Sequence, residues 1–127
     1  MIVNDPATLA EVEAAVADYE RALMANDLEA LDALFWQSPA TVRYGPGQNL
    51  HGIEAIKAFR VGRPGGSPQR AVTKVIITSF GSDCATANVE FQREGAAKPG
   101  RQSQTWVRFP EGWRVVAAHI SMLGDGH

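Results

Sequence analysis

Four long runs of alternating residues fill the second half of the chain and constrain its fold more than any other feature. They cover about 70–80, 84–93, 100–109 and 112–123. The turns between them are short, and the last is only Pro110-Glu111-Gly112. Strands joined by so few residues must run antiparallel to one another. The sequence therefore predicts an antiparallel meander of four strands.

The last of these strands predicts the wall of a pocket, because its residues divide between two faces at every second position. One face carries Trp113, Val115, Ala117, His119 and Ser121, and the other carries Arg114, Val116, Ala118, Ile120 and Met122. The first face ends in two polar side chains, which is typical of a cavity lining. The second is largely apolar. Since one layer of helices cannot cover both sides of a sheet, we expect this second face to form a homodimer contact.

The first half of the chain predicts helices. Over residues 7–25, apolar side chains and Tyr19 recur at three- and four-residue steps after a helix start at Asp5-Pro6. The other expected elements are a helix over 28–36, short strands over 41–44 and 48–51, and a helix over 53–62. Three helices gathered on one face of a curved, cone-shaped antiparallel sheet give an α+β fold, with a single domain over residues 1–127.

Composition argues against several classes of protein. The formal net charge is −2 and no basic stripe is interleaved with aromatics, so nucleic-acid binding is not expected. No apolar run approaches the roughly 18 residues of a membrane span and no signal peptide is apparent, so we expect a cytoplasmic protein without membrane partners. The histidines at 51, 119 and 127 are scattered, and the single Cys84 excludes a cysteine-rich metal site. We therefore expect no metal and no cofactor.

Two arginines are candidate anion ligands. Arg43 lies on the first short strand, and Arg60 continues the inward stripe of the third helix. A guanidinium group forks onto a carboxylate, so two of them facing one cavity would suit a small carboxylated substrate. The alternative is that each pairs with an internal acid. The nearby acids fall on expected solvent faces, which favours the ligand: Asp18, Glu20, Asp32 and Glu54. Arg63 flanks a loop and is a weaker candidate.

Five other side chains could line the same cavity. Tyr19 is either a core residue or a proton donor. His119 is either structural or, together with Ser121, a ligand holder. Gln104 and Trp106 share one face of their strand, and they form either a neutral wall for a urea or amide group or part of a subunit interface.

Six segments spread over nearly the whole chain follow the pattern of a known family. They are Ala22-Leu23, Leu34–Trp36, Thr41–Gly45, Ile56–Arg60, Gly100–Phe109 and Glu111–His119. This pattern resembles the AtzH-like family, and the element order resembles the nuclear transport factor 2-like (SnoaL-like) superfamily, whose members place their sites inside a cone. The resemblance implies essential roles for Tyr19 and Arg43. It also implies metal-free decarboxylating amidohydrolysis of 1,3-dicarboxyurea to allophanate, in nitrogen catabolism.

That substrate is a small planar dianion, and it fits the candidate residues. Arg43 and Arg60 could each hold one carboxylate, and Gln104 or His119 could hold the urea carbonyl. Tyr19 or His119 could supply a proton to the nitrogen that loses its carboxylate, while Trp106 and Ser121 would orient the substrate.

Two other functions stay open at this stage. One is an accessory protein that binds a carboxylated intermediate and passes it to a partner amidase, and the other is a lyase or isomerase of the wider superfamily. Gln48 and His51 depart from the family pattern, which expects an acid and an aromatic residue there. A related ureido acid or oxalurate-like compound is therefore an alternative substrate.

Overall fold

The computed structural model describes residues 1–124, and it contains all the predicted helices and strands. In chain order they are α1 (Pro6–Ala25), α2 (Leu28–Ala33), β1 (Val42–Gly45), β2 (Gln48–His51), α3 (Ile53–Gly62), β3 (Arg70–Phe80), β4 (Cys84–Arg93), β5 (Gly100–Phe109) and β6 (Gly112–Met122). The α+β class is confirmed. Helix α2 ends three residues earlier than predicted, and Phe35 instead forms an isolated bridge to Val115 of β6.

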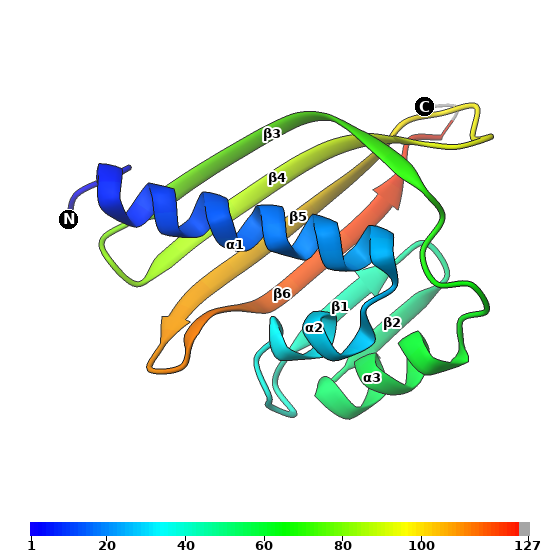
Figure 1. The fold of residues 1–127 in the computed structure, drawn as a ribbon, viewed down its shortest axis with the longest axis horizontal. Helices are drawn as coiled ribbons and strands as arrows, with labels where there is room; N and C mark the ends of the chain where they lie inside the picture. Colours follow the sequence, from blue (N-terminus) through cyan, green and yellow to red (C-terminus); the bar gives the residue numbers. More distant parts are fainter. Residues whose placement is uncertain (125–127) are drawn as a thin grey trace.

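The strands form one curved sheet in the order β2-β1-β6-β5-β4-β3 (Figure 1). Strands β3 to β6 pair antiparallel along the sheet, as the short turns predicted. Strand β1 pairs with β6 in parallel, which the sequence did not indicate, and it places Arg43 opposite Ala118. The hairpin of β1 and β2 thereby extends the sheet beyond β6.

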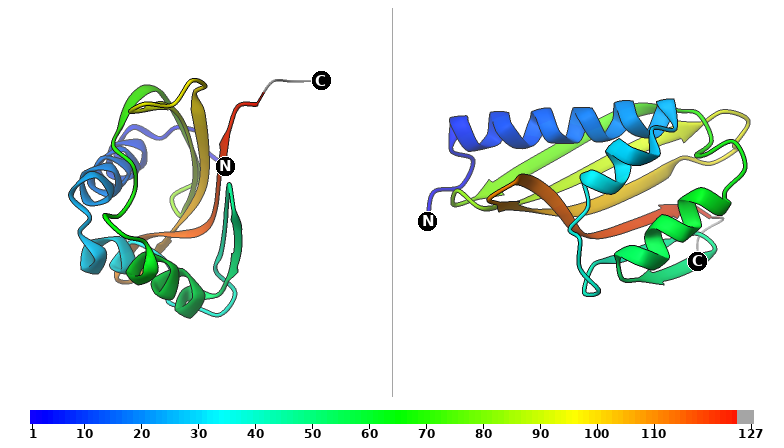
Figure 2. Two further views of the ribbon diagram at one scale, coloured as in Figure 1. Left: turned by 90° about the vertical axis from the view of Figure 1, so that its right-hand side faces the viewer. Right: turned by 60° about the horizontal axis from the view of Figure 1, so that its bottom comes forward.

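All three helices lie on one side of the sheet and leave its other side uncovered (Figure 2). Helix α1 crosses β3 to β6, while α2 and α3 cover the end of the sheet near β1 (Figure 1). The side facing the helices is called the inner face below, and the uncovered side the outer face. The core lies between the inner face and the helices, and its largest fully buried side chains include Trp106, Tyr19, Phe35, Phe91, Leu31 and Ile56.

The link between α1 and α2 follows from two capping residues. Helix α1 ends at Asn26, whose left-handed backbone (φ 52°) terminates the helix. The next residue, Asp27, accepts a hydrogen bond from the Ala30 backbone N–H and so caps α2 at once. The predicted tight αα-hairpin is confirmed. It turns α2 back towards the sheet and brings Asp32 close to α3.

A β-bulge in β6 overturns the predicted division of that strand into two faces. Trp106 of β5 pairs with Val115, but Thr105 pairs with Ala117, so Val116 has no partner and the alternation shifts by one residue. Trp113 and Val115 face inward as predicted. Beyond the bulge it is Ala118 and Ile120 that are buried, while His119 is exposed. The prediction that His119 and Ser121 share the face of Trp113 was therefore wrong, and the apolar outer face predicted for a dimer does not exist in that form.

Gly100 offers a direct test of core packing. A Cβ atom at this position would overlap two carbons of the Phe91 ring, which is fully buried and packs against the Arg70 guanidinium. Gly100→Ala should therefore lower the free energy of unfolding by about 1–3 kcal/mol in urea titrations. Gly47→Ala is the control, since its Cβ would meet nothing within 4 Å. Equal effects of the two substitutions would contradict this packing.

Candidate functional site

Tyr19 and Arg43 are both buried, one on helix α1 and the other on strand β1. Tyr19 belongs to the buried stripe of α1 and is 2% exposed, and its ring lies 6.2 Å from that of Phe35. Arg43 is 5% exposed on β1. Burial lowers the pKa of Arg43, and the negative charge that Tyr19 carries when it is ionised opposes this lowering. The fold thus brings together the two residues singled out by the family resemblance.

Arg60 is buried as predicted, but it has an acidic partner. One of its terminal nitrogens lies 2.5 Å from Asp32 Oδ1, and its guanidinium packs 4.5 Å from the centre of the Phe35 ring. The prediction that Asp32 faces solvent was wrong, because the αα-hairpin turns this end of α2 towards α3. The charge of Arg60 is therefore largely compensated within the protein.

A second buried ion pair was not predicted. Arg70 at the start of β3 forms a bidentate pair with Glu20 of α1, with N–O distances of 3.0 and 2.6 Å, and it also donates to Gln102. Glu20 therefore points to the sheet rather than to solvent. Opposite Arg70 in the register lies Arg93 of β4, which sequence analysis also missed. A signal existed for Arg93, since it continues the buried alternating series of Val89 and Phe91.

Buried nitrogens on the sheet, on α3 and directly after α3 have no hydrogen-bond acceptor in the described part of the chain. Within residues 1–124 they are Arg43 Nη1, Arg60 Nη2, Arg63 Nε, Arg93 Nε and Gln104 Nε2. All five are donors, and a buried donor without an acceptor costs free energy. Such a set of donors is suited to an anionic ligand, whose oxygens only accept hydrogen bonds.

Electrostatics supports the same interpretation. Burial lowers the pKa of Arg43 from its ordinary value, and the nearby charges of Arg60, Arg63 and Arg93 lower it further. The pKa of Arg63 is lowered by the same two kinds of cause, with Arg60 and Arg93 as the neighbouring charges. The guanidinium charges thus make this region positive, and a bound carboxylate would offset the repulsion between them.

Gln104 and Trp106 form part of the inner wall, as the alternation of β5 predicted. Both are buried, and the Trp106 indole N–H donates to the side-chain oxygen of Gln104 over 3.1 Å. That hydrogen bond fixes which end of the amide is free: the oxygen is used, and the NH2 group is the unpartnered donor. Gln104 can therefore donate to a carbonyl oxygen.

The structure does not bring His119 and Ser121 to this site. His119 lies exposed on the outer face, with its ring edge-on to Tyr44 at 5.8 Å. Ser121 accepts a hydrogen bond from Arg101 on the same face. His51 packs against the other edge of Tyr44, and His127 lies outside the described residues. The bulge at Val116 is the cause, since it reverses the orientation of every later residue of β6.

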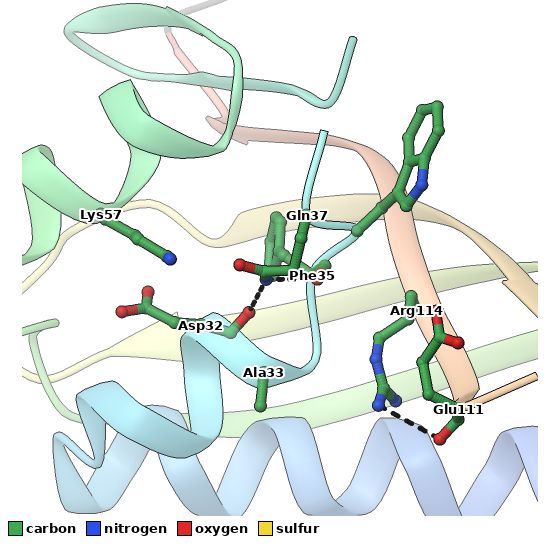
Figure 3. A pocket seen from close by; sticks show the side chains of 8 residues that line it. Asp32, Ala33, Phe35, Gln37, Lys57, Glu111 and Arg114 are labelled. Carbon is green, nitrogen blue, oxygen red and sulfur yellow. Dashed lines mark hydrogen bonds between the residues drawn. The ribbon is translucent and has the colours of Figure 1, made fainter. Parts of the chain in front are cut away.

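A pocket of about 460 Å³ opens behind the Arg60–Asp32 pair. Its lining comprises Asp32, Ala33, Phe35, Trp36, Gln37, Lys57, Glu111 and Arg114. In Figure 3 the Gln37 amide is turned onto backbone oxygens and Arg114 onto the carbonyl of Glu111. These polar groups already bind the protein, and charges of both signs face the opening. We therefore locate the candidate site at the inner-face arginines rather than in this pocket.

Two kinds of feature were not found in the described part of the chain. No group of three or more His, Cys, Asp or Glu residues is arranged to hold a metal ion. No helix in residues 1–124 is long and apolar enough to cross a membrane.

Comparisons with known proteins found one matching family and several similar solved structures. The sequence profile of the AtzH-like family matches residues 1–126. A protein of unknown function from Pectobacterium atrosepticum is 53% identical over 96% of this chain and 95% of its own, with a TM-score of 0.93. A cystatin-like fold protein from Burkholderia xenovorans is 46% identical over 99% of each chain, with a TM-score of 0.94. No curated protein matches.

A more distant structure identifies the fold. A nuclear transport factor 2-like superfamily protein from Salmonella enterica is 24% identical over 95% of this chain and 98% of its own, with a TM-score of 0.75. The predicted nuclear transport factor 2-like fold is therefore confirmed.

The Arg60–Asp32 pair should matter for stability. The Arg60 side chain is 3% exposed, so Asp32→Asn would leave a buried charge uncompensated. We expect a loss of about 2–3 kcal/mol in the free energy of unfolding, at or below the low end for buried pairs because Asp32 is 24% exposed. The control is Asp83→Asn, which breaks an exposed pair with Arg108 and should cost less than about 1 kcal/mol. A negligible effect of Asp32→Asn in urea titrations would contradict this assignment.

Proposed function

The chain belongs to the AtzH-like family, and on that premise we propose that it is a metal-free decarboxylating amidohydrolase that converts 1,3-dicarboxyurea to allophanate. The observation that carries the proposal is the buried Arg43 guanidinium, which has no acidic partner in residues 1–124 and interacts with Tyr19. A small carboxylated substrate supplies the negative charge that Arg43 lacks. Cytoplasmic location and a role in nitrogen catabolism stay predictions from the sequence and the family resemblance.

The reaction balances without a redox partner. 1,3-Dicarboxyurea and water give allophanate and bicarbonate, and the bond that breaks joins a urea nitrogen to its terminal carboxyl carbon. The oxygen of the water forms a new bond to that carbon as the C–N bond breaks, and the carboxyl group leaves as bicarbonate. The nitrogen must therefore gain a proton, and the departing carboxyl group must be held while the bond breaks. A permanently charged guanidinium suits the second task, and a phenol can perform the first.

The inner-face residues can be assigned to these tasks. Arg43 would hold the departing carboxylate and stabilise the charge that develops on it. Tyr19 would donate the proton to the nitrogen and regain one from the attacking water, since His119 lies on the outer face. A phenolate formed on Tyr19 would lie among the guanidinium charges of Arg43 and Arg63. The free NH2 group of Gln104 would hold the urea carbonyl, with Trp106 positioning it.

The proposal is tested by bicarbonate release from 1,3-dicarboxyurea. Tyr19→Phe removes only the phenolic hydroxyl group, which carries the proton that is transferred, and Arg43→Ala removes the charge that holds the carboxylate. Each should lower kcat/KM by at least about 100-fold, the range expected for a general acid or an oxyanion-stabilising group. Tyr44→Phe is the matched control, because this second tyrosine lies against His119 on the outer face, and its turnover should be unchanged.

Other outcomes would point to the other functions. Full turnover by folded Tyr19→Phe and Arg43→Ala would refute the two assignments. Binding of dicarboxyurea by the wild type without bicarbonate release would favour an accessory protein that serves a partner amidase. Release of an isomer or a dehydrated product would favour the isomerases and lyases of the superfamily.

We also propose that the chain forms a homodimer through the outer face. The helices leave this face uncovered, and its centre bears small and polar side chains around a shallow hollow of about 310 Å³, among them Thr86, Ser103, Thr105, Ala117 and His119. Sedimentation of the protein at micromolar concentration should give the mass of a dimer. A monomeric mass would contradict this part of the proposal.

A further inference from the structure

The arginines of the chain differ in what compensates their charge. Those that pair with carboxylates are Arg21, Arg60, Arg70 and Arg108. Arg101 and Arg114 donate to neutral oxygens. Arg43, Arg63 and Arg93 have no acidic partner within 4 Å in the described part of the chain, and each has a buried nitrogen without an acceptor. These three charges are left for a ligand to compensate.

Arg63 lies close to Arg43 although it comes from a different element. It follows the last residue of α3 with an extended backbone, which ends the helix and turns the chain towards β3. Its guanidinium carbon lies 5.1 Å from the centre of the Phe59 ring, and that of Arg43 lies 5.2 Å from the same ring. One aromatic side chain of α3 therefore supports both cations.

Arg93 reaches the same region from the sheet. Its guanidinium carbon lies 5.6 Å from the centre of the Phe91 ring, and its charge acts on both Arg43 and Arg63. Arg63 and Arg93 are only partly buried, whereas Arg43 is almost fully buried. Arg43 is thus the most deeply buried of the three groups, and Arg63 and Arg93 are nearer to solvent.

We infer that Arg63 and Arg93 form a second anion subsite, which binds the far carboxylate of a dicarboxylated substrate while Arg43 binds the carboxylate that is lost. The inference rests on the proposed function for the identity of the substrate, but not for the existence of the subsite. It replaces the prediction that Arg60 holds the second carboxylate, because Asp32 already compensates Arg60. The protein would then prefer a dianion, because Arg43 binds one carboxylate and Arg63 and Arg93 bind the other.

The physical reason for that specificity is the number of charges to be compensated. A monocarboxylate on Arg43 leaves Arg63 and Arg93 repelling each other and Arg43 with nothing to offset them. A dicarboxylate provides acceptors for the unpartnered nitrogens at both ends. Losing the second set of charge-assisted hydrogen bonds should cost about tenfold or more in affinity.

Binding of two unreactive probes tests this directly. Glutarate has the chain length of dicarboxyurea with a carboxylate at each end, and valerate is the same chain with one carboxylate replaced by a methyl group. Calorimetric titration at fixed ionic strength should show glutarate binding the wild type at least about tenfold more tightly than valerate. Arg63→Gln and Arg93→Gln should each weaken glutarate binding far more than valerate binding and so remove most of this preference. Arg108→Gln, on an exposed ion pair, should keep the preference.

The outcomes separate this inference from the proposed function. Circular dichroism confirms that each variant is folded, and Arg63→Lys, which keeps the charge but loses the fork, should retain an intermediate preference. An unchanged preference in folded Arg63→Gln and Arg93→Gln would overturn the subsite, whatever the turnover. A lost preference in a protein that releases no bicarbonate from dicarboxyurea would keep the subsite and refute the proposed reaction. Inorganic phosphate binding as tightly as glutarate, with the same dependence on Arg63, would overturn the selectivity for dicarboxylates.

Discussion

Guanidinium charge is buried beneath the helices, and both the packing of this protein and its candidate site depend on how that charge is compensated. Five arginines reach the inner face, and two of them are compensated by Asp32 and Glu20. The remaining three repel one another at positions that the sheet and α3 fix. Burying uncompensated charge lowers the free energy of unfolding. An anionic ligand that binds during function would supply the missing negative charge.

Aromatic rings make this arrangement possible. Phe35, Phe59 and Phe91 each pack against one or two guanidinium groups, which keeps these groups in fixed positions without neutralising them. The ion pairs of Arg60 and Arg70 tie α2 and α1 to α3 and the sheet, so the elements that carry Tyr19 and Arg43 are held together. The same interactions thus stabilise the fold and position the site.

The sequence was sufficient for the fold because alternation and turn residues are local signals. It indicated that Tyr19 is buried, because this residue continues the apolar stripe of α1, and it placed Arg43 on a strand. It failed for His119 and Ser121, since a bulge at Val116 leaves no mark in the residue types around it and inverts the rest of β6. It also failed for Asp32 and Glu20, because a carboxylate on the rim of a helix can turn to solvent or to an arginine, and only tertiary packing decides which.

The most direct test of where the two carboxylates bind is a crystal structure of the protein with glutarate bound. We expect one carboxylate on Arg43 within hydrogen-bonding distance of the Tyr19 hydroxyl, and the other between Arg63 and Arg93. Glutarate bound instead in the pocket lined by Lys57 and Arg114, or on the outer face near His119, would contradict this expectation.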